Sequence, residues 1–78
     1  MFEPKGNDCF LAFWTTPRKG SAATRAIKEG AGWRADKTVA IAGAWMPWEP
    51  ITSEAFPNPE QAISACRIEA NAEAWVDA

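Results

Sequence analysis

Few side chains of this sequence could take part in a reaction, because it contains no histidine and no tyrosine. Neither Cys9 nor Cys66 lies in a motif that would lower its pKa and make it a nucleophile. A carboxylate pair for acid–base catalysis could come from two of the acids Glu49, Glu54 and Glu69. Such a pair needs a cleft, however, and 78 residues can scarcely enclose one. The sequence therefore predicts a protein that is not an enzyme and that uses no cofactor.

Acidic residues near the C-terminus form a regular charge pattern. Glu69, Glu73 and Asp77 are spaced i, i+4, i+8, so on one helix they would repel by about 0.2–0.5 kcal/mol per pair. We expect this row either to dock a basic partner or to be paired by cations elsewhere, the candidates being Arg18, Lys19, Arg25, Lys28 and Arg34. No metal site is expected, because carboxylates on a single helix face rarely complete a coordination shell.

Cationic residues concentrate in the stretch from residue 17 to residue 37, which holds six Lys or Arg residues and two acids. Cations beside stacking rings are typical of single-stranded nucleic-acid binding. The candidate residues are Arg18, Lys19, Arg25, Trp33 and Arg34, with Trp14 beside them. Nucleic acid is the less favoured partner, since a chain with a net charge of −2 repels phosphate at long range.

The segment GAWMPWEPI, Gly43–Ile51, places two tryptophans among two prolines. Trp45 ends a predicted strand and is expected in the core. Trp48 lies between a proline and an acid, which hold it extended at low entropy, as a presented binding anchor requires. The alternative is that Trp48 folds back over the open end of the sheet. The candidate partner-binding residues are Trp48, Glu49, Glu69, Glu73 and Asp77.

Apolar runs and turn residues predict the elements that would position these groups. Strands are expected at Cys9–Thr16, Thr38–Trp45 and Ile51–Phe56, with Gly43 as a bulge or a point of close approach. The segment 21–29, SAATRAIKE, favours a short helix, because a serine stands at its start and a glycine follows it. Alternation within the same segment equally suits an edge strand.

The C-terminal helix has the clearest local signal. Asn58 is the expected N-cap, Pro59 the first helical residue and Gln61, at the third helical position, the residue that completes a capping box, and the helix is predicted to run to about Val76. Its apolar residues fall into two stripes, one of Ala65, Ile68, Ala72 and Trp75 and one of Ile63, Cys66 and Ala70. We expect the sheet to cover one stripe and the short helix at 21–29 to cover the other. The alternative is that a partner or a second protomer covers one of them, which would make a homodimer through the C-terminal helix.

These elements predict one α+β domain, residues 1–78, with a small antiparallel sheet of three to four strands and a C-terminal helix packed across one face. Most of the five tryptophans must be buried, since each can bury about 150–250 Å² in a chain with few large aliphatic residues. The N-terminal residues contain no signal peptide and no apolar run spans a membrane, so the expected location is the cytoplasm. Cys9 and Cys66 are then expected to stay reduced, with a single disulfide as the alternative.

Charge is distributed unevenly, with seven basic and four acidic residues in positions 1–39 and one basic and six acidic residues in positions 40–78. Such a dipolar layout favours oriented docking. The sequence therefore predicts a non-enzymatic protein-binding module that occupies the surface of a larger protein partner. One alternative is an inhibitor of the phage or mobile-element type, whose acidic helix face mimics nucleic acid. The other is a single-stranded nucleic-acid-binding protein.

Overall fold

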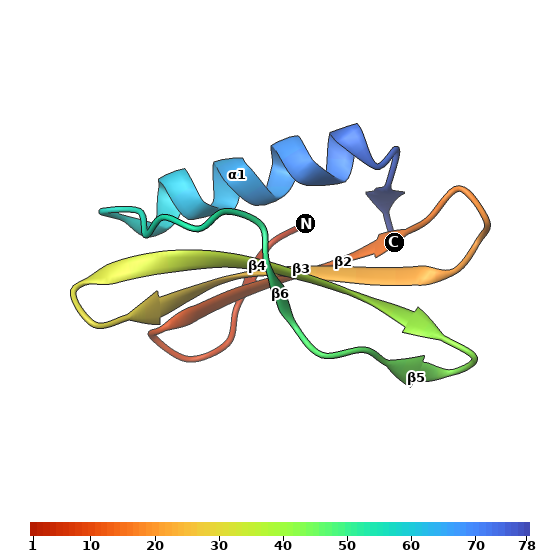
Figure 1. The fold of residues 1–78 in the computed structure, drawn as a ribbon, viewed down its shortest axis with the longest axis horizontal. Coiled ribbons are helices and arrows are strands. Elements are labelled where there is room, and N and C mark those ends of the chain that lie inside the picture. Colours follow the sequence, from red (N-terminus) through yellow and green to blue (C-terminus); the bar gives the residue numbers. More distant parts are fainter.

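Three long antiparallel strands form the centre of the protein, and one helix lies across one of their faces (Figure 1). The structure is a computed structural model that describes residues 1–78. The strands are β2 (Cys9–Thr15), β3 (Ser21–Glu29) and β4 (Gly32–Ile41), paired in sequence order, and the helix is α1 (Pro59–Ala72). The protein therefore has the predicted α+β architecture, with an antiparallel sheet and a C-terminal helix.

Four two-residue strands complete the sheet, which has seven strands instead of the three or four predicted. β1 (Glu3–Pro4) and β7 (Val76–Asp77) pair with β2, whereas β5 (Ala44–Trp45) and β6 (Glu49–Pro50) pair with β4. These short pairings protect the two outer long strands, whose free N–H and C=O groups would otherwise be templates for aggregation. Two residues are too few to show alternation, so no sequence pattern predicts such strands.

Segment 21–29 is β3, the central strand of the sheet, so the helix that it favoured is wrong, whereas the strand alternative is right except that β3 does not lie at an edge. Ala22 and Ala26 pack against α1, whereas Ala23 and Arg25 lie on the opposite face. Alanine favours a helix by local propensity, but here β2 and β4 supply hydrogen-bonding partners on both sides. Tertiary pairing therefore overrides a local preference that is worth only a few tenths of a kcal/mol per residue.

β4 begins earlier and ends earlier than the strand predicted at 38–45. Its first half, which lies before the predicted strand, pairs with β3 from Gly32 onward. The strand ends at Ile41 because Ala42 and Gly43 have φ values of 52° and 81° and form the two-residue turn into β5. Gly43 is thus a hairpin residue and not a bulge.

The strand predicted at 51–56 is also wrong. β6 ends at Pro50, and the following residues are bends without strand pairing, apart from a single bridge between Phe56 and Trp33. The Ile51 N–H donates to the Ala35 carbonyl at 2.8 Å, so this loop is still anchored to the outer edge of β4.

The predicted N-cap and first residue of α1 are confirmed, but its predicted end is not, and the capping box is only half formed because the Gln61 side chain makes no return bond to Asn58. The Asn58 side chain accepts a hydrogen bond from the Gln61 backbone N–H at 2.9 Å, and Pro59 is the first helical residue. The helix ends at Ala72 and not near Val76, because Ala74 adopts a left-handed φ of 59° that reverses the chain. This reversal places Trp75 in the core and lets β7 pair with β2.

The core lies between α1 and the sheet, and alanines line it on both sides. Small side chains let the helix approach the sheet closely, and Trp14, Trp33 and Trp75 fill the volume that remains. The Trp14 indole N–H donates to the Thr24 hydroxyl at 2.9 Å, so the buried polar atoms of both side chains are satisfied. The buried alanines between the sheet and the helix are Ala12, Ala22, Ala26 and Ala35 of the sheet and Ala62 and Ala70 of the helix.

Of the two predicted apolar stripes, the one that contains Cys66 and Ala70 faces the sheet, whereas the other is divided, since Ala65 and Trp75 contact the core and Ala72 is exposed. Ile68 of the other stripe is 69% exposed. The prediction that a second helix covers this stripe is wrong, because the segment expected to form that helix is β3. α1 falls short of the length and apolarity that a membrane-crossing helix needs.

Candidate functional site

The face of the sheet opposite α1, here called the open face, has no helix over it (Figure 1). Ala23, Asp36 and Thr38 are nevertheless buried on this face. Part of their cover is the segment from Trp45 to Glu49, here called the arm, which leads from β5 to β6. Met46 fixes the arm through its N–H, which donates to the Val39 carbonyl at 3.0 Å.

A groove of about 320 Å³, here called the open-face groove, lies between the arm and β2. The only polar side chain that lines it is Thr38, and the Thr38 hydroxyl already donates to the Met46 carbonyl at 2.6 Å. Its surface is therefore apolar and largely aromatic, as in sites that anchor a side chain of a ligand. The lining residues are Leu11, Phe13, Ala23, Thr38, Trp45, Met46 and Trp48.

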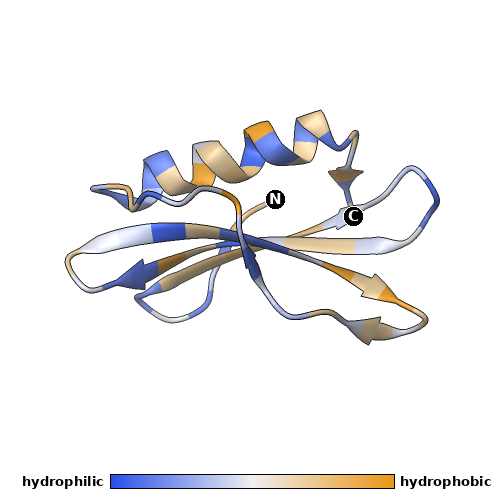
Figure 2. Ribbon diagram, in the orientation of Figure 1, coloured by the Kyte–Doolittle hydropathy of each residue, from blue (hydrophilic) through white to orange (hydrophobic).

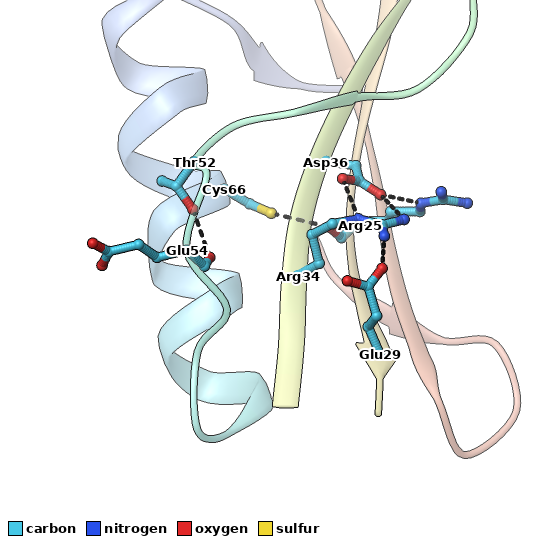
Figure 3. Close-up of polar contacts among 7 residues, drawn as sticks. All are labelled: Arg25, Glu29, Arg34, Asp36, Thr52, Glu54 and Cys66. Atoms are coloured by element: carbon cyan, nitrogen blue, oxygen red, sulfur yellow. Dashed lines mark hydrogen bonds and ion pairs between the residues drawn. The ribbon is translucent and has the colours of Figure 1, made fainter. Parts of the chain in front are cut away.

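Trp48 is held in this groove by a network of ion pairs. The Arg25 guanidinium lies 4.3 Å from the centre of the Trp48 ring, and its Nε–H donates to Asp36 at 2.8 Å. Arg34 donates to the other Asp36 oxygen at 2.8 Å and also contacts Glu29 (Figure 3). Because the Asp36 side chain is only 2% exposed, these bonds fix Arg25, and the cation–π contact in turn fixes Trp48.

Phe13 and Trp45 form the rim at the other end of the groove. Their ring centres are 6.0 Å apart, and the two residues are 49% and 48% exposed. The prediction that Trp45 belongs to the core is therefore wrong, because the turn at Ala42–Gly43 carries it out of β4 and onto the rim. Apolar residues at the β4–β5 end of the sheet stand out in Figure 2.

A second groove, here called the edge groove, lies on the other side of the arm, between the arm and the C-terminal end of α1, and measures about 290 Å³. Its lining mixes apolar and charged side chains and includes two of the acids singled out in the sequence, Glu49 and Glu73. The full set is Lys37, Thr38, Val39, Ile41, Met46, Pro47, Glu49, Glu73 and Trp75.

The predicted acidic row does not form. Glu69 lies in α1, Glu73 is the C-cap of α1, and Asp77 lies in β7, where it contacts the N-terminal amino group. Glu69 is paired with Lys37, which was not among the five cations expected to form ion pairs with the acidic row. The structure thus brings Glu49, Glu69 and Glu73 together around Lys37 but separates them from Trp48, which faces the other groove.

The five residues of the nucleic-acid alternative do not come together on one surface. Trp33 and Trp14 are buried under α1, so neither ring is free to stack on a base. Arg25 and Arg34 are bound to Asp36, whereas Arg18 and Lys19 lie in the β2–β3 turn and make no ion pair.

Both cysteines are free, and neither has an environment that would activate it. Burial raises the pKa of the Cys66 thiol to about 12, and its Sγ–H donates to the Arg25 carbonyl at 3.5 Å. Burial also raises the pKa of Cys9, which lies at the far end of the open face. No group of three or more Cys, Asp or Glu side chains is arranged to hold a metal ion.

Sequence reasoning missed the β2 side of the open-face groove, Leu11 and Phe13. The predicted strand at 9–16 was apolar on both faces, which indicated burial on both sides. In the structure only the side chains that point toward α1, Ala12 and Trp14, are fully covered. The signal that could have found the missed residues is that both predicted helices were expected to pack together on one side of the sheet, which leaves its other face without a helix.

Comparisons with protein-family models, with curated proteins and with solved structures find no match for this chain. The two grooves on either side of the arm are therefore the basis for a proposed function.

Proposed function

We propose that the protein is a non-enzymatic binding module that occupies the surface of a larger protein, and that its open-face groove receives an apolar side chain of this partner. The observation that carries the proposal is the groove itself, an apolar hollow lined by Phe13, Trp45 and Trp48. A polar occupant would lose its bonds to water there without regaining them, because the one hydroxyl in the lining already has a partner.

Rigidity of the groove supports this role. Trp48 follows Pro47 and is fixed by the Arg25 guanidinium, so little side-chain entropy is lost when a ligand packs against it. Tryptophan and arginine are also enriched among residues that contribute most to protein–protein binding. At about 320 Å³ the groove lies at the lower end of small-molecule sites, a size that suits one or two side chains of a larger partner.

Charge around the groove indicates which residue should stand next to the apolar anchor. Arg25 uses only its Nε–H in hydrogen bonds, which leaves the other guanidinium N–H groups free beside Trp48. Arg18 and Lys19, which make no ion pair, lie in the turn at the Phe13 end of β2. An acidic residue beside the apolar side chain would complement these cations.

Selection from a phage-displayed library of random short peptides tests the proposal. We expect the selected peptides to share an apolar residue next to Asp or Glu. Their affinity should fall by about 30-fold or more with Trp48→Ala, the loss typical of a central binding residue, as measured by isothermal titration calorimetry. Ile68→Ala is the matched control, because it removes an exposed apolar side chain from the outer face of α1.

Three results would contradict the proposal. One is a set of selected peptides that bind Trp48→Ala as well as they bind the wild type. The second is binding of single-stranded oligothymidine that depends on Trp45 and Trp48. The third is a sedimentation mass twice that of the chain that returns to the monomer mass with Trp48→Ala, which would make a second copy the occupant.

A further inference from the structure

The arm separates two grooves of different chemistry. Trp45 and Trp48 line the open-face groove, whereas Pro47 and Glu49 line the edge groove, and Met46 borders both. A partner that lies across the arm would therefore contact both grooves at once, one on each side of a single extended segment.

The edge groove combines apolar walls with unpaired negative charge. Val39, Pro47 and the buried Trp75 form its apolar part. Glu49 and Glu73 also line it, and neither makes an ion pair anywhere in the protein. An apolar wall beside free carboxylates is complementary to a side chain that has a long aliphatic stem and a cationic end.

Lys37 supports this reading of the groove. Its ammonium group contacts Glu69, and the hydrogen bond to Glu69 together with the charges of Glu73 and Glu49 raises the pKa of Lys37 above its ordinary value. One lysine therefore faces three carboxylates, and the excess charge of the site is negative. A second cation would find two carboxylates that the first has not neutralised.

We infer that the edge groove binds an arginine side chain of a partner protein, an inference that rests on the proposed function for the identity of the partner. The stem of the arginine would lie along Val39 and Pro47, and its guanidinium would reach Glu49 and Glu73. Arginine fits better than lysine, because its planar group carries five N–H donors in a fixed fork that can engage two carboxylates at once.

Nuclear magnetic resonance can test the groove with a probe that needs no knowledge of the partner. N-acetyl-arginine amide supplies the side chain, and N-acetyl-citrulline amide is its uncharged match in shape. The readout is the indole N–H signal of each tryptophan, since Trp75 reports on the edge groove and Trp45 and Trp48 report on the open-face groove. We expect the arginine probe to shift the Trp75 signal and the citrulline probe to leave it in place.

Variants of the two carboxylates make the test specific. Glu49→Gln and Glu73→Gln should each weaken binding of the arginine probe by about 1.5- to 5-fold, the range of partly exposed charge pairs. Glu60→Gln is the matched control, because this exposed carboxylate without an ion pair lies in the first turn of α1, at the other end of the helix. Both edge-groove variants should fold normally, since neither carboxylate is paired.

The inference would be overturned by an equal response to the citrulline probe, or by binding that neither glutamine substitution weakens. The inference would also be overturned if a lysine probe or calcium chloride shifted the Trp75 signal at a lower concentration than the arginine probe does. Its failure is distinguishable from failure of the proposed function. If the selected peptides need Trp48 but the arginine probe does not shift the Trp75 signal, only the arginine site is contradicted. If the arginine probe shifts the Trp75 signal but no selected peptide needs Trp48, only the proposed apolar anchor site is contradicted.

Discussion

On the α1 side of the sheet, alanines bring the helix close to the strands and three tryptophans fill the space between them. On the open face, the buried Asp36 carboxylate holds two arginines, and the arm adds half-exposed aromatic rings above them. Apolar packing against a helix leaves no surface for a ligand, whereas a face fixed by ion pairs and one extended segment stays accessible. The difference teaches that packing against α1 closes one face of the sheet, whereas the ion pairs of the other face leave aromatic rings half-exposed at its surface.

The largest expected effect comes from replacing one tryptophan by alanine on each face and comparing the losses of stability. Trp14→Ala should lower the free energy of unfolding by about 3–5 kcal/mol, because it opens a cavity under α1 and removes the partner of the Thr24 hydroxyl. Trp45→Ala on the rim should cost less than about 1 kcal/mol, since half of that residue is already in water. Urea unfolding of both variants measures the difference, and equal losses would show that the two faces do not differ in their role.

Breaking the ion-pair network should have the next largest effect. Asp36→Asn leaves Arg25 and Arg34 without their shared carboxylate, and we expect a loss of about 2–3 kcal/mol. This is below the range for fully buried pairs, because both arginine side chains are partly exposed. The Trp48 indole signal should broaden or move as the ring loses its fixed cation. An unchanged Trp48 signal would show that the ion-pair network does not determine the position of this ring in the groove.

The buried Cys66 thiol predicts a loss of stability at alkaline pH. Its pKa is raised from 9.0 to about 12 in the folded protein, so the folded state keeps a proton that the unfolded chain releases. The stabilisation is complete below pH 9 and decreases as the pH rises from there toward the folded value, by up to about 1.4 kcal/mol per pH unit. Cys66→Ala should unfold with a shallower pH dependence between pH 8 and pH 10 in urea titrations.

Reaction of the thiols with Ellman's reagent provides a control for this prediction. Cys9 is partly exposed on the open face and should react in the native protein, whereas Cys66 under α1 should react only after unfolding. Equal reaction rates would contradict the contrast between the two faces.

The smallest effect is expected on the outer side of α1. Ile68→Asp should change the free energy of unfolding by less than about 0.5 kcal/mol, because the side chain is 69% exposed. Sedimentation should give the same mass for this variant and the wild type. A mass that is halved by the substitution would identify a homodimer through α1, which was the alternative from the sequence, and would extend binding surfaces beyond the open face.

The start of α1 could be predicted from the sequence, because a cap is a local structure. Asn58, Pro59 and the Gln61 backbone N–H are within four residues of one another, and the cap depends on nothing outside them. Burial of most of the tryptophans was predictable from their size, but which ones was not, because Trp14, Trp33 and Trp75 are buried whereas Trp45, which was expected in the core, is 48% exposed.

The strand at 21–29 and the grooves of the open face could be recognised only in the tertiary structure. An alanine-rich segment has a weak helical preference, and only the pairing offered by β2 and β4 made it the central strand. The candidate site depends on residues far apart in the chain, such as Phe13 beside Trp45 and Arg25 beneath Trp48. Local sequence sets caps and turns because their energies are local, whereas the course of the arm across the sheet depends on which face α1 leaves uncovered.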